Sequence, residues 1–328
     1  MANEQEKFKT MIGGQALIEG IMMRGPEKDA VVVRTKDELK IEVTPRKVHP
    51  KGSFCTWPLV RGVVGFFDSQ VTGVKALMKS ADFSPEETPE EPSKLDLWLE
   101  KKLGDKGFQN FIISVAVFLG LAMSIGLFFL LPMIVGSVVS NWVDSNLVLN
   151  LMEGLVRIII FVTYIALISQ MNEMKRVFAY HGAEHKPIRC YEAGLPLTVE
   201  NIRQQTRIHP RCGTSFLLVV MILSILVFSV ASSLLLAIVP ELADMRGQFL
   251  YSLIMIVFKL LLLPLIVAIS YEINRWVGRN DNGFTKVLTA PGMWFQNFTT
   301  CEPDDSMIEV AITAVEAVLP EEAGADRW

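Results

Sequence analysis

Residues 181–185 read His-Gly-Ala-Glu-His and hold two of the four histidines in the chain. Positions i, i+3 and i+4 share one face of a helix, so His181, Glu184 and His185 are expected to point the same way. Two imidazoles beside a carboxylate suit zinc or a similar first-row metal, and His-x-x-Glu-His is the order found in inverted zinc peptidases. The spacing therefore predicts a metal site. The alternative is that both histidines only bond carbonyls and carboxylates at a helix end.

A catalytic zinc usually has three protein ligands and a water, so two histidines need at least one more partner. The same polar segment offers His209 and Cys212, and Glu272 lies at the end of a later apolar run. We expect His181, His185 and His209 to hold the metal, with Cys212 or Glu272 as a further ligand.

Two glutamates are candidates for proton transfer at this site. Glu184 could act as general base on a metal-activated water, which would make the reaction a hydrolysis, or it could support a ligand. Glu19 lies in an apolar, glycine-rich run near the N-terminus, together with Arg24. It could bind the metal, orient a histidine or handle protons. The alternative is a buried strand in which Glu19 pairs with Arg24.

The elements that must position these residues are largely membrane spans. The chain is 51% hydrophobic with a mean hydropathy of +0.36. Its apolar residues fall into four blocks that approach or exceed the ~20 residues needed to cross a bilayer. The blocks are Phe111–Val139, Leu155–Gln170, Phe216–Val239 and Phe249–Ile273. The sequence predicts an α-helical integral membrane protein whose four transmembrane helices form two hairpins. A net charge of −4 gives no case for nucleic acid as a partner.

Positive charge predicts the orientation of these spans. Residues 140–154 contain no Lys or Arg, and residues 240–248 contain only Arg246. The segment between the hairpins is rich in basic residues, namely Lys175, Arg176, Lys186, Arg189, Arg203, Arg207 and Arg211. Because Lys and Arg collect on the cytoplasmic side, we expect both termini and this central segment to be cytoplasmic, at a bacterial inner membrane.

The parts outside the spans are expected to form a small mixed α/β cytoplasmic domain. Residues 58–80 have the pattern of an amphipathic helix, which could pack on a sheet or lie on the membrane. The second span is expected to continue as one helix to about His185, where Pro187 ends it. The regions are expected as follows: 1–57 β-rich, 58–80 amphipathic helix, 81–107 acidic Pro-rich linker and lead-in, 108–171 first hairpin, 172–215 His-rich loop, 216–273 second hairpin and 274–328 C-terminal region.

Two basic residues lie inside the predicted spans. Arg157 could pair with Glu153, four residues earlier, or extend to the outer interface. Lys259 precedes Pro264, which can kink its helix. A buried cation on a kinked helix could bind an anionic group such as a lipid phosphate.

Several long motifs resemble those of the YqhQ-like family of bacterial membrane proteins. The opening run from Gly13 to Pro26 is similar to that family's first signature. The central and C-terminal motifs are similar too: Tyr180-His181-Gly182-Ala183-Glu184-His185-Lys186, His209-Pro210-Arg211-Cys212-Gly213-Thr214-Ser215-Phe216, Ser270-Tyr271-Glu272, Thr299-Thr300 and Glu302-Pro303. The family is largely uncharacterised, and its members are often labelled predicted metal-dependent enzymes.

Two classes of function follow. The first is a metal-dependent hydrolase, with zinc as the expected metal, acting on a membrane-associated substrate. The second is a non-enzymatic membrane factor or scaffold that binds lipid, a protein partner such as the insertion machinery, or further copies of itself. It would hold a structural metal or none.

Overall fold

The computed structural model describes residues 8–36, 38–50, 52–83, 98, 101–143, 145–245, 248–280, 282–322 and 324–327. The acidic run Ser84–Pro92, which the sequence predicts to be a linker, lies outside the described residues. The chain divides into two compact units. The sheet unit comprises Met1–Pro85, Tyr164–Ser224 and Leu262–Trp328, and the helical unit comprises Glu86–Thr163 and Ile225–Leu261.

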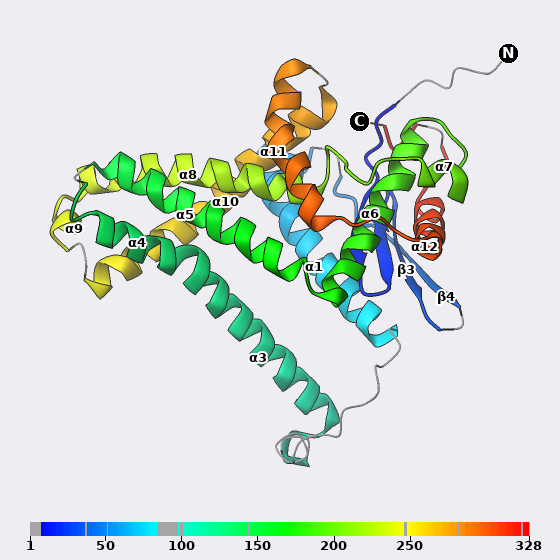
Figure 1. Cartoon of the computed structure of the whole chain (residues 1–328), viewed down its shortest axis with the longest axis horizontal. Coiled ribbons are helices and arrows are strands. Elements are labelled where there is room, and N and C mark those ends of the chain that lie inside the picture. Colours follow the sequence, from blue (N-terminus) through cyan, green and yellow to red (C-terminus); the bar gives the residue numbers. More distant parts are fainter. Residues whose placement is uncertain are drawn as a thin grey trace. The chain divides into compact units, whose positions relative to one another are not determined.

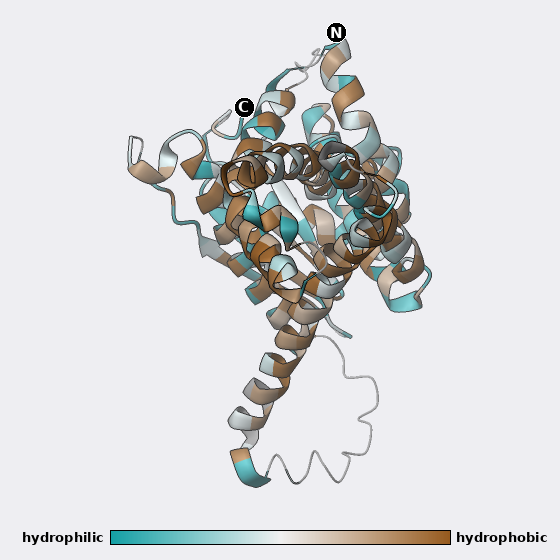
Figure 2. Cartoon of the chain, turned by 90° about the vertical axis from the view of Figure 1, so that its left-hand side faces the viewer, coloured by the Kyte–Doolittle hydropathy of each residue, from teal (hydrophilic) through white to brown (hydrophobic). Residues whose placement is uncertain are grey.

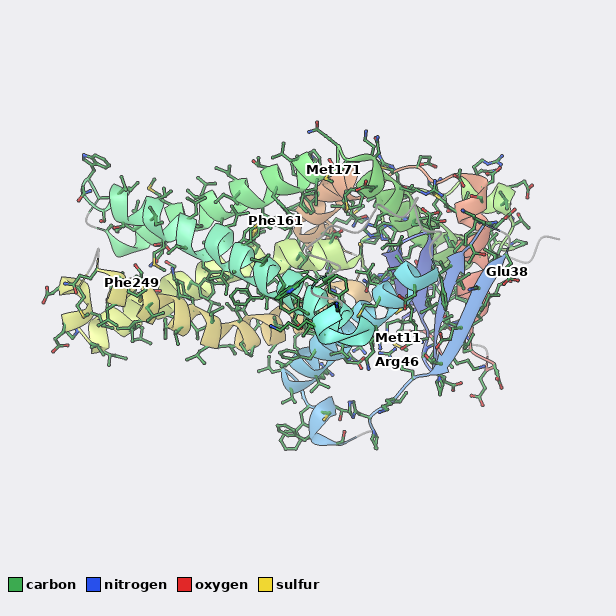
Figure 3. The ribbon with its side chains drawn as sticks, turned by 90° about the horizontal axis from the view of Figure 1, so that it is seen from below. Met11, Glu38, Arg46, Phe161, Met171 and Phe249 are labelled. Carbon is green, nitrogen blue, oxygen red and sulfur yellow. The ribbon has the colours of Figure 1, made fainter. Side chains whose placement is uncertain are left out.

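The sheet unit is built on a four-stranded antiparallel meander. Its strands pair in sequence order and are β1 (Gly13–Leu17), β2 (Gly20–Arg24), β3 (Lys28–Arg34) and β4 (Leu39–Pro45). Glu38 marks the turn before β4 and Arg46 its far end (Figure 3). The N-terminal β-rich region is therefore confirmed, and its first apolar run is a tight hairpin that turns at Glu19, where φ is 52°.

Helices cover both faces of this sheet. Successive strand residues point to opposite faces, so Ile21 and Val32 meet one layer while Met22 meets the other. The first layer consists of α6 (Asn172–Glu192) and α12 (Asp305–Glu316), which lie beside the sheet (Figure 1). The second is α1 (Val60–Phe83), which packs through Ala76. The predicted amphipathic helix thus packs on the sheet, although its stripe of Phe67, Val71, Val74 and Met78 stays exposed.

Within the described part of the chain, four helices are long and apolar enough to cross a membrane. They cover Phe111–Val139, Val148–Ile168, Gly213–Ile238 and Phe249–Arg279. Brown, apolar residues predominate along them in Figure 2. The elements that form these four candidate spans are α3 (Asp105–Ile125), the π-helical turn η2 (Gly126–Leu130) and α4 (Leu131–Val139) for the first, then α5 (Asn146–Ile168), α8 (Gly213–Ile238) and α10 (Phe249–Arg279). The other helical elements are η1 (Phe54–Thr56), α7 (Val199–Arg203), α9 (Glu241–Asp244) and α11 (Gly283–Thr299).

The prediction of one continuous helix ending near His185 was wrong in two respects: the helix is interrupted before Asn172, and it extends beyond His185. α5 stops at Ile168, and Met171 is extended, with a ψ of 137°, before α6 begins. α6 then continues through Pro187 to Glu192. An interior proline costs about 3 kcal/mol or more because it lacks an N–H and clashes with the preceding turn. Here Ile188 and Cys190 are buried in two hydrophobic clusters, and their packing offsets that cost.

Candidate metal centre

Two histidines of α6 are anchored through the same ring atom. His181 Nδ1 lies 2.7 Å from the carbonyl oxygen of Thr299, and His185 Nδ1 lies 2.6 Å from that of Arg207. A carbonyl oxygen can only accept a hydrogen bond, so Nδ1 carries the proton in both rings. The neutral tautomer then leaves a lone pair on each Nε2.

The two Nε2 atoms lie beside the thiol of Cys212. His181 Nε2 is 3.1 Å from Cys212 Sγ, and the rings of His181 and His185 have centroids 4.5 Å apart. His185 Nε2 is buried and has no hydrogen-bond partner among the residues that the structure describes. One nitrogen from each histidine and the sulfur all lie within 4.8 Å of one another. We call His181, His185 and Cys212 the ligand cluster, because these three side chains could hold one metal ion.

Gly182 allows the chain near Cys301 to approach α6. A Cβ at position 182 would overlap the carbonyl oxygen of Cys301, and the N–H of Cys301 donates to Phe178 at 2.8 Å. This close approach brings the carbonyl of Thr299 within reach of His181. The glycine between the two histidines is therefore part of how the first ring is oriented.

Glu184 faces the sheet instead of joining the ligand cluster. Its Oε1 accepts the N–H of Gly14 at 2.9 Å. The side chain is buried, which raises the pKa of its carboxyl, although its electrostatic interaction with His181 works against that shift. Gly14 is tightly packed, since a Cβ there would overlap Met22 and press on Glu184. Its role as a base stays a prediction.

His209, the expected third ligand, lies outside the ligand cluster. Its ring Nε2 is 3.6 Å from a carboxylate oxygen of Glu192, and its backbone N–H donates to the side-chain oxygen of Gln296 at 2.8 Å. Burial lowers the pKa of His209 to about 4, although the hydrogen bond with Glu192 acts to raise it. The ring is therefore neutral near pH 7. The structure brings Cys212 to the place where we expected His209.

The two other acidic candidates form ion pairs elsewhere. Glu19 binds Arg176 and lies 3.4 Å from the hydroxyl of Tyr180. Glu272 binds Arg61 and also accepts the N–H of Leu59 at 3.2 Å. Neither joins the ligand cluster.

The expected Glu19–Arg24 pair does not form. Arg24 instead contacts Asp29 at 3.2 Å and Asp68 at 2.7 Å.

The charged residues of the helical unit are paired differently than expected. Glu153 contacts Lys259 at 2.6 Å, whereas Arg157 Nε donates to the carbonyl of Phe128 at 2.7 Å. Pro132 has no N–H to donate to that carbonyl, which lies four residues before it. Arg157 is 8% exposed and Lys259 3%, so within this unit neither side chain extends outward. Lys259 therefore already has its counter-charge, which weakens the expectation that it binds a lipid phosphate.

A small cavity lies beside the Glu153–Lys259 pair. Its volume is about 60 Å³, and Ser137, Ser232 and Tyr251 contribute to its lining. At roughly 10–15 Å³ per water, this is space for a few water molecules.

Sequence reasoning missed the anchors of the two histidines. They are backbone carbonyls of Thr299 and Arg207, and an oxygen present in every residue leaves no side-chain signal. Of the two anchoring residues, only Thr299 lies in a motif that carried the family resemblance.

Comparison with known proteins supplies the family. Residues 57–321 match the family described as "Protein of unknown function (DUF1385)". The chain belongs to this family. It is also 32% identical over 331 residues to "Uncharacterized protein YqhQ" of Bacillus subtilis (strain 168), covering 97% of this chain and 95% of that protein. No solved structure matches. The resemblance read from the motifs is confirmed.

Proposed function

We propose that this DUF1385 protein binds one divalent transition metal, with zinc as the expected ion, through His181 Nε2, His185 Nε2 and Cys212 Sγ. The observation that carries this proposal is the buried, unpartnered Nε2 of His185. A buried polar atom without a partner costs about 1–3 kcal/mol, and a metal ion would remove that cost. Anchoring of ligand histidines through the opposite ring nitrogen is a regular feature of metal sites.

We further propose that the centre is hydrolytic. Three protein ligands leave room for a fourth, as in catalytic zinc sites, where the metal supplies an activated water. Glu184 is the candidate proton acceptor because its buried carboxyl lies close enough to His181 for the two side chains to interact electrostatically. In this role its Oε1 would stay fixed by the Gly14 N–H while the carboxyl accepts a proton. A Glu184→Gln variant should therefore keep the metal.

The proposed substrate is associated with a membrane. Cys212 immediately precedes α8, one of the four helices able to span a bilayer. The basic segment 171–215 supports a cytoplasmic position for the ligand cluster, with both termini on the same side of a bacterial inner membrane. A substrate would then be reached at the membrane surface.

A non-enzymatic membrane factor is the second candidate. The exposed stripe of Phe67, Val71, Val74 and Met78 on α1 favours it, because an uncovered apolar helix face is a typical binding surface. Its partner would be a membrane protein such as the insertion machinery, a second copy of this chain, or lipid. In this case the metal would be structural or absent.

Elemental analysis of the purified full-length protein tests the metal proposal. We expect about one zinc per chain in the wild type and in a His49→Ala control, since His49 is exposed and outside the ligand cluster. His185→Ala should lose the metal. A wild type that stays empty after reconstitution, or a His185→Ala variant that binds as well as wild type, would overturn the proposal.

A further inference from the structure

The short helix η1 and the residues that lead from it to α1 expose a cluster of large apolar side chains. Phe54, Trp57 and Leu59 are 64%, 55% and 43% exposed. The rings of Phe54 and Trp57 pack edge-on, with centroids 5.5 Å apart. We call this stretch the 54–59 segment. Clustered apolar side chains on a surface usually mark a place where another apolar surface makes contact.

The 54–59 segment is held in a strained backbone conformation. Leu59 has a φ of 69°, in the left-handed region that a bulky side chain rarely adopts. Its N–H donates to Glu272 Oε1 at 3.2 Å. Such strain is found most often at functional positions, where the surrounding structure imposes it. Here the contact with Glu272 fixes an exposed apolar residue in place.

The end of α10 is the point to which this segment is attached. Arg61 Nε donates to Glu272 Oε1 at 2.7 Å, and a Cβ at Gly62 would lie 2.8 Å from Cβ of Tyr271. Glu272 immediately precedes Ile273, the last residue of the apolar run in α10. The attachment is therefore within about 2 Å of the end of that run, at 1.5 Å per residue. The headgroup layer extends roughly 5–8 Å outside the hydrocarbon. If α10 spans a bilayer, the 54–59 segment lies at headgroup depth.

A second exposed aromatic pair marks the same level of α10. Trp276 lies three residues after Ile273, and its ring centroid is 6.1 Å from that of Phe284 in α11. These two side chains are 44% and 66% exposed. Tryptophan collects at membrane–water interfaces because its ring is apolar and its N–H is polar. Two aromatic pairs from different segments thus surround the end of one candidate span.

The charge around the 54–59 segment also suits a phospholipid surface. Residues 43–67 contain no Asp or Glu. The basic residues of this stretch are Arg46, Lys47, Lys51 and Arg61. Arg61 is neutralised by Glu272, and Arg46 donates to the carbonyl of Gly25, so neither is counted as a free charge. The lysines are attracted to lipid phosphates, and no carboxylate of this stretch opposes them.

We infer that the 54–59 segment inserts into the headgroup layer of a phospholipid bilayer and fixes the sheet unit against the membrane at the end of α10. The inference rests on the proposed membrane location of the chain. It does not depend on a metal in the ligand cluster.

Light-activated crosslinking of the full-length protein tests this inference, in vesicles of phosphatidylglycerol and phosphatidylcholine. A photoreactive benzoylphenylalanine replaces Trp57, and in separate proteins it replaces Leu265 or Leu195. Leu265 is 46% exposed within the apolar run of α10 and reports whether that helix lies in lipid. Leu195 is 42% exposed in the loop between α6 and α7, away from α10 in Figure 1, and is the matched control. Mass spectrometry identifies each crosslinked partner.

Lipid adducts should form at positions 57 and 265 and be absent at position 195. Lipid adducts at 265 without any at 57 would overturn the inference and leave the membrane location intact. Crosslinks from 57 to a second copy of the chain in place of lipid would do the same. No lipid adduct at 265 would overturn the membrane location, and the inference with it.

Discussion

Two buried polar clusters, one in each unit, satisfy their side chains in opposite ways. In the helical unit, the carboxylate of Glu153 and the ammonium of Lys259 satisfy each other at 2.6 Å. In the sheet unit, the ligand cluster brings three potential metal-ligating atoms together, and His185 Nε2 finds no hydrogen-bond partner in the described part of the chain. Buried polar atoms are usually satisfied, so the two arrangements indicate different purposes. The first is complete within the protein, and the second is complete only with a ligand.

This difference has an energetic consequence. Removing one partner of a buried ion pair destabilises the protein. Adding an ion that completes a ligand set stabilises the protein, because the ion binds only the folded state. This difference can therefore be tested by removing charges from the helical unit and by adding metal to the sheet unit.

The largest effect is expected for the ion pair. Lys259→Met or Glu153→Gln alone should destabilise the protein by about 3–5 kcal/mol. Each variant removes one charge of the pair and leaves the other charge buried without its counter-charge. The double variant should recover most of that loss. Thermal unfolding in detergent of the two single variants and the double variant gives the coupling. Additive losses would mean that the two charges do not compensate each other.

Zinc should stabilise the ligand cluster. At a free concentration 100 times the Kd, a ligand that binds only the folded state adds about 2.7 kcal/mol. The melting temperature of wild type should rise with zinc and fall with a chelator, and His185→Ala should respond to neither. A Lys259→Met protein that still responds to zinc would separate the two units cleanly.

Gly182→Ala should weaken metal binding without removing a ligand. The added methyl group would push the chain at Cys301 away from α6 and disturb the hydrogen bond from His181 to Thr299. Loss of such a supporting contact typically reduces metal affinity by about 10–100-fold. Zinc titration measures this, with Gly120→Ala as control because its Cβ would meet open space. Equal affinity in both variants would contradict the role given to Gly182.

At neutral pH, the smallest effect concerns His209. Its pKa is about 4 in the folded protein against 6.5 for a free ring, so the unfolded chain binds this proton more readily. Stability should therefore fall as the pH drops from about 6.5 towards 4, by at most about 1.4 kcal/mol per pH unit. His209→Gln should flatten this part of the stability profile and keep the metal. Loss of the metal from this variant would restore His209 as a ligand.

The fold was predictable where the pattern is local. Runs of apolar residues predicted the four long helices, and the region 1–57 that was expected to be β-rich contains the four-stranded sheet. The break at Met171 and the continuation through Pro187 were not predictable, since both depend on packing between segments distant in sequence. Ile188, for example, is buried in the same cluster as Val310 of α12.

The candidate site was predictable only within α6. Spacing correctly brought the rings of His181 and His185 together. It favoured His209 as the third ligand, whereas the structure places Cys212 in the ligand cluster. Contacts such as that of His209 N–H with Gln296 set the path of that segment. Glu184 was expected to share the histidine face. Adjacent helical residues differ in direction by about 100°, however, and Glu184 bonds Gly14 while its neighbour His185 meets Arg207.

The central claim is that these two histidines and Cys212 hold one metal ion, and cobalt(II) substitution tests it most directly. Thiolate coordination gives a charge-transfer absorption in the near ultraviolet. We predict this band in wild type and in Cys301→Ser, and its loss in Cys212→Ser and in His185→Ala. No band in cobalt-treated wild type, or a band that survives Cys212→Ser, would contradict the account.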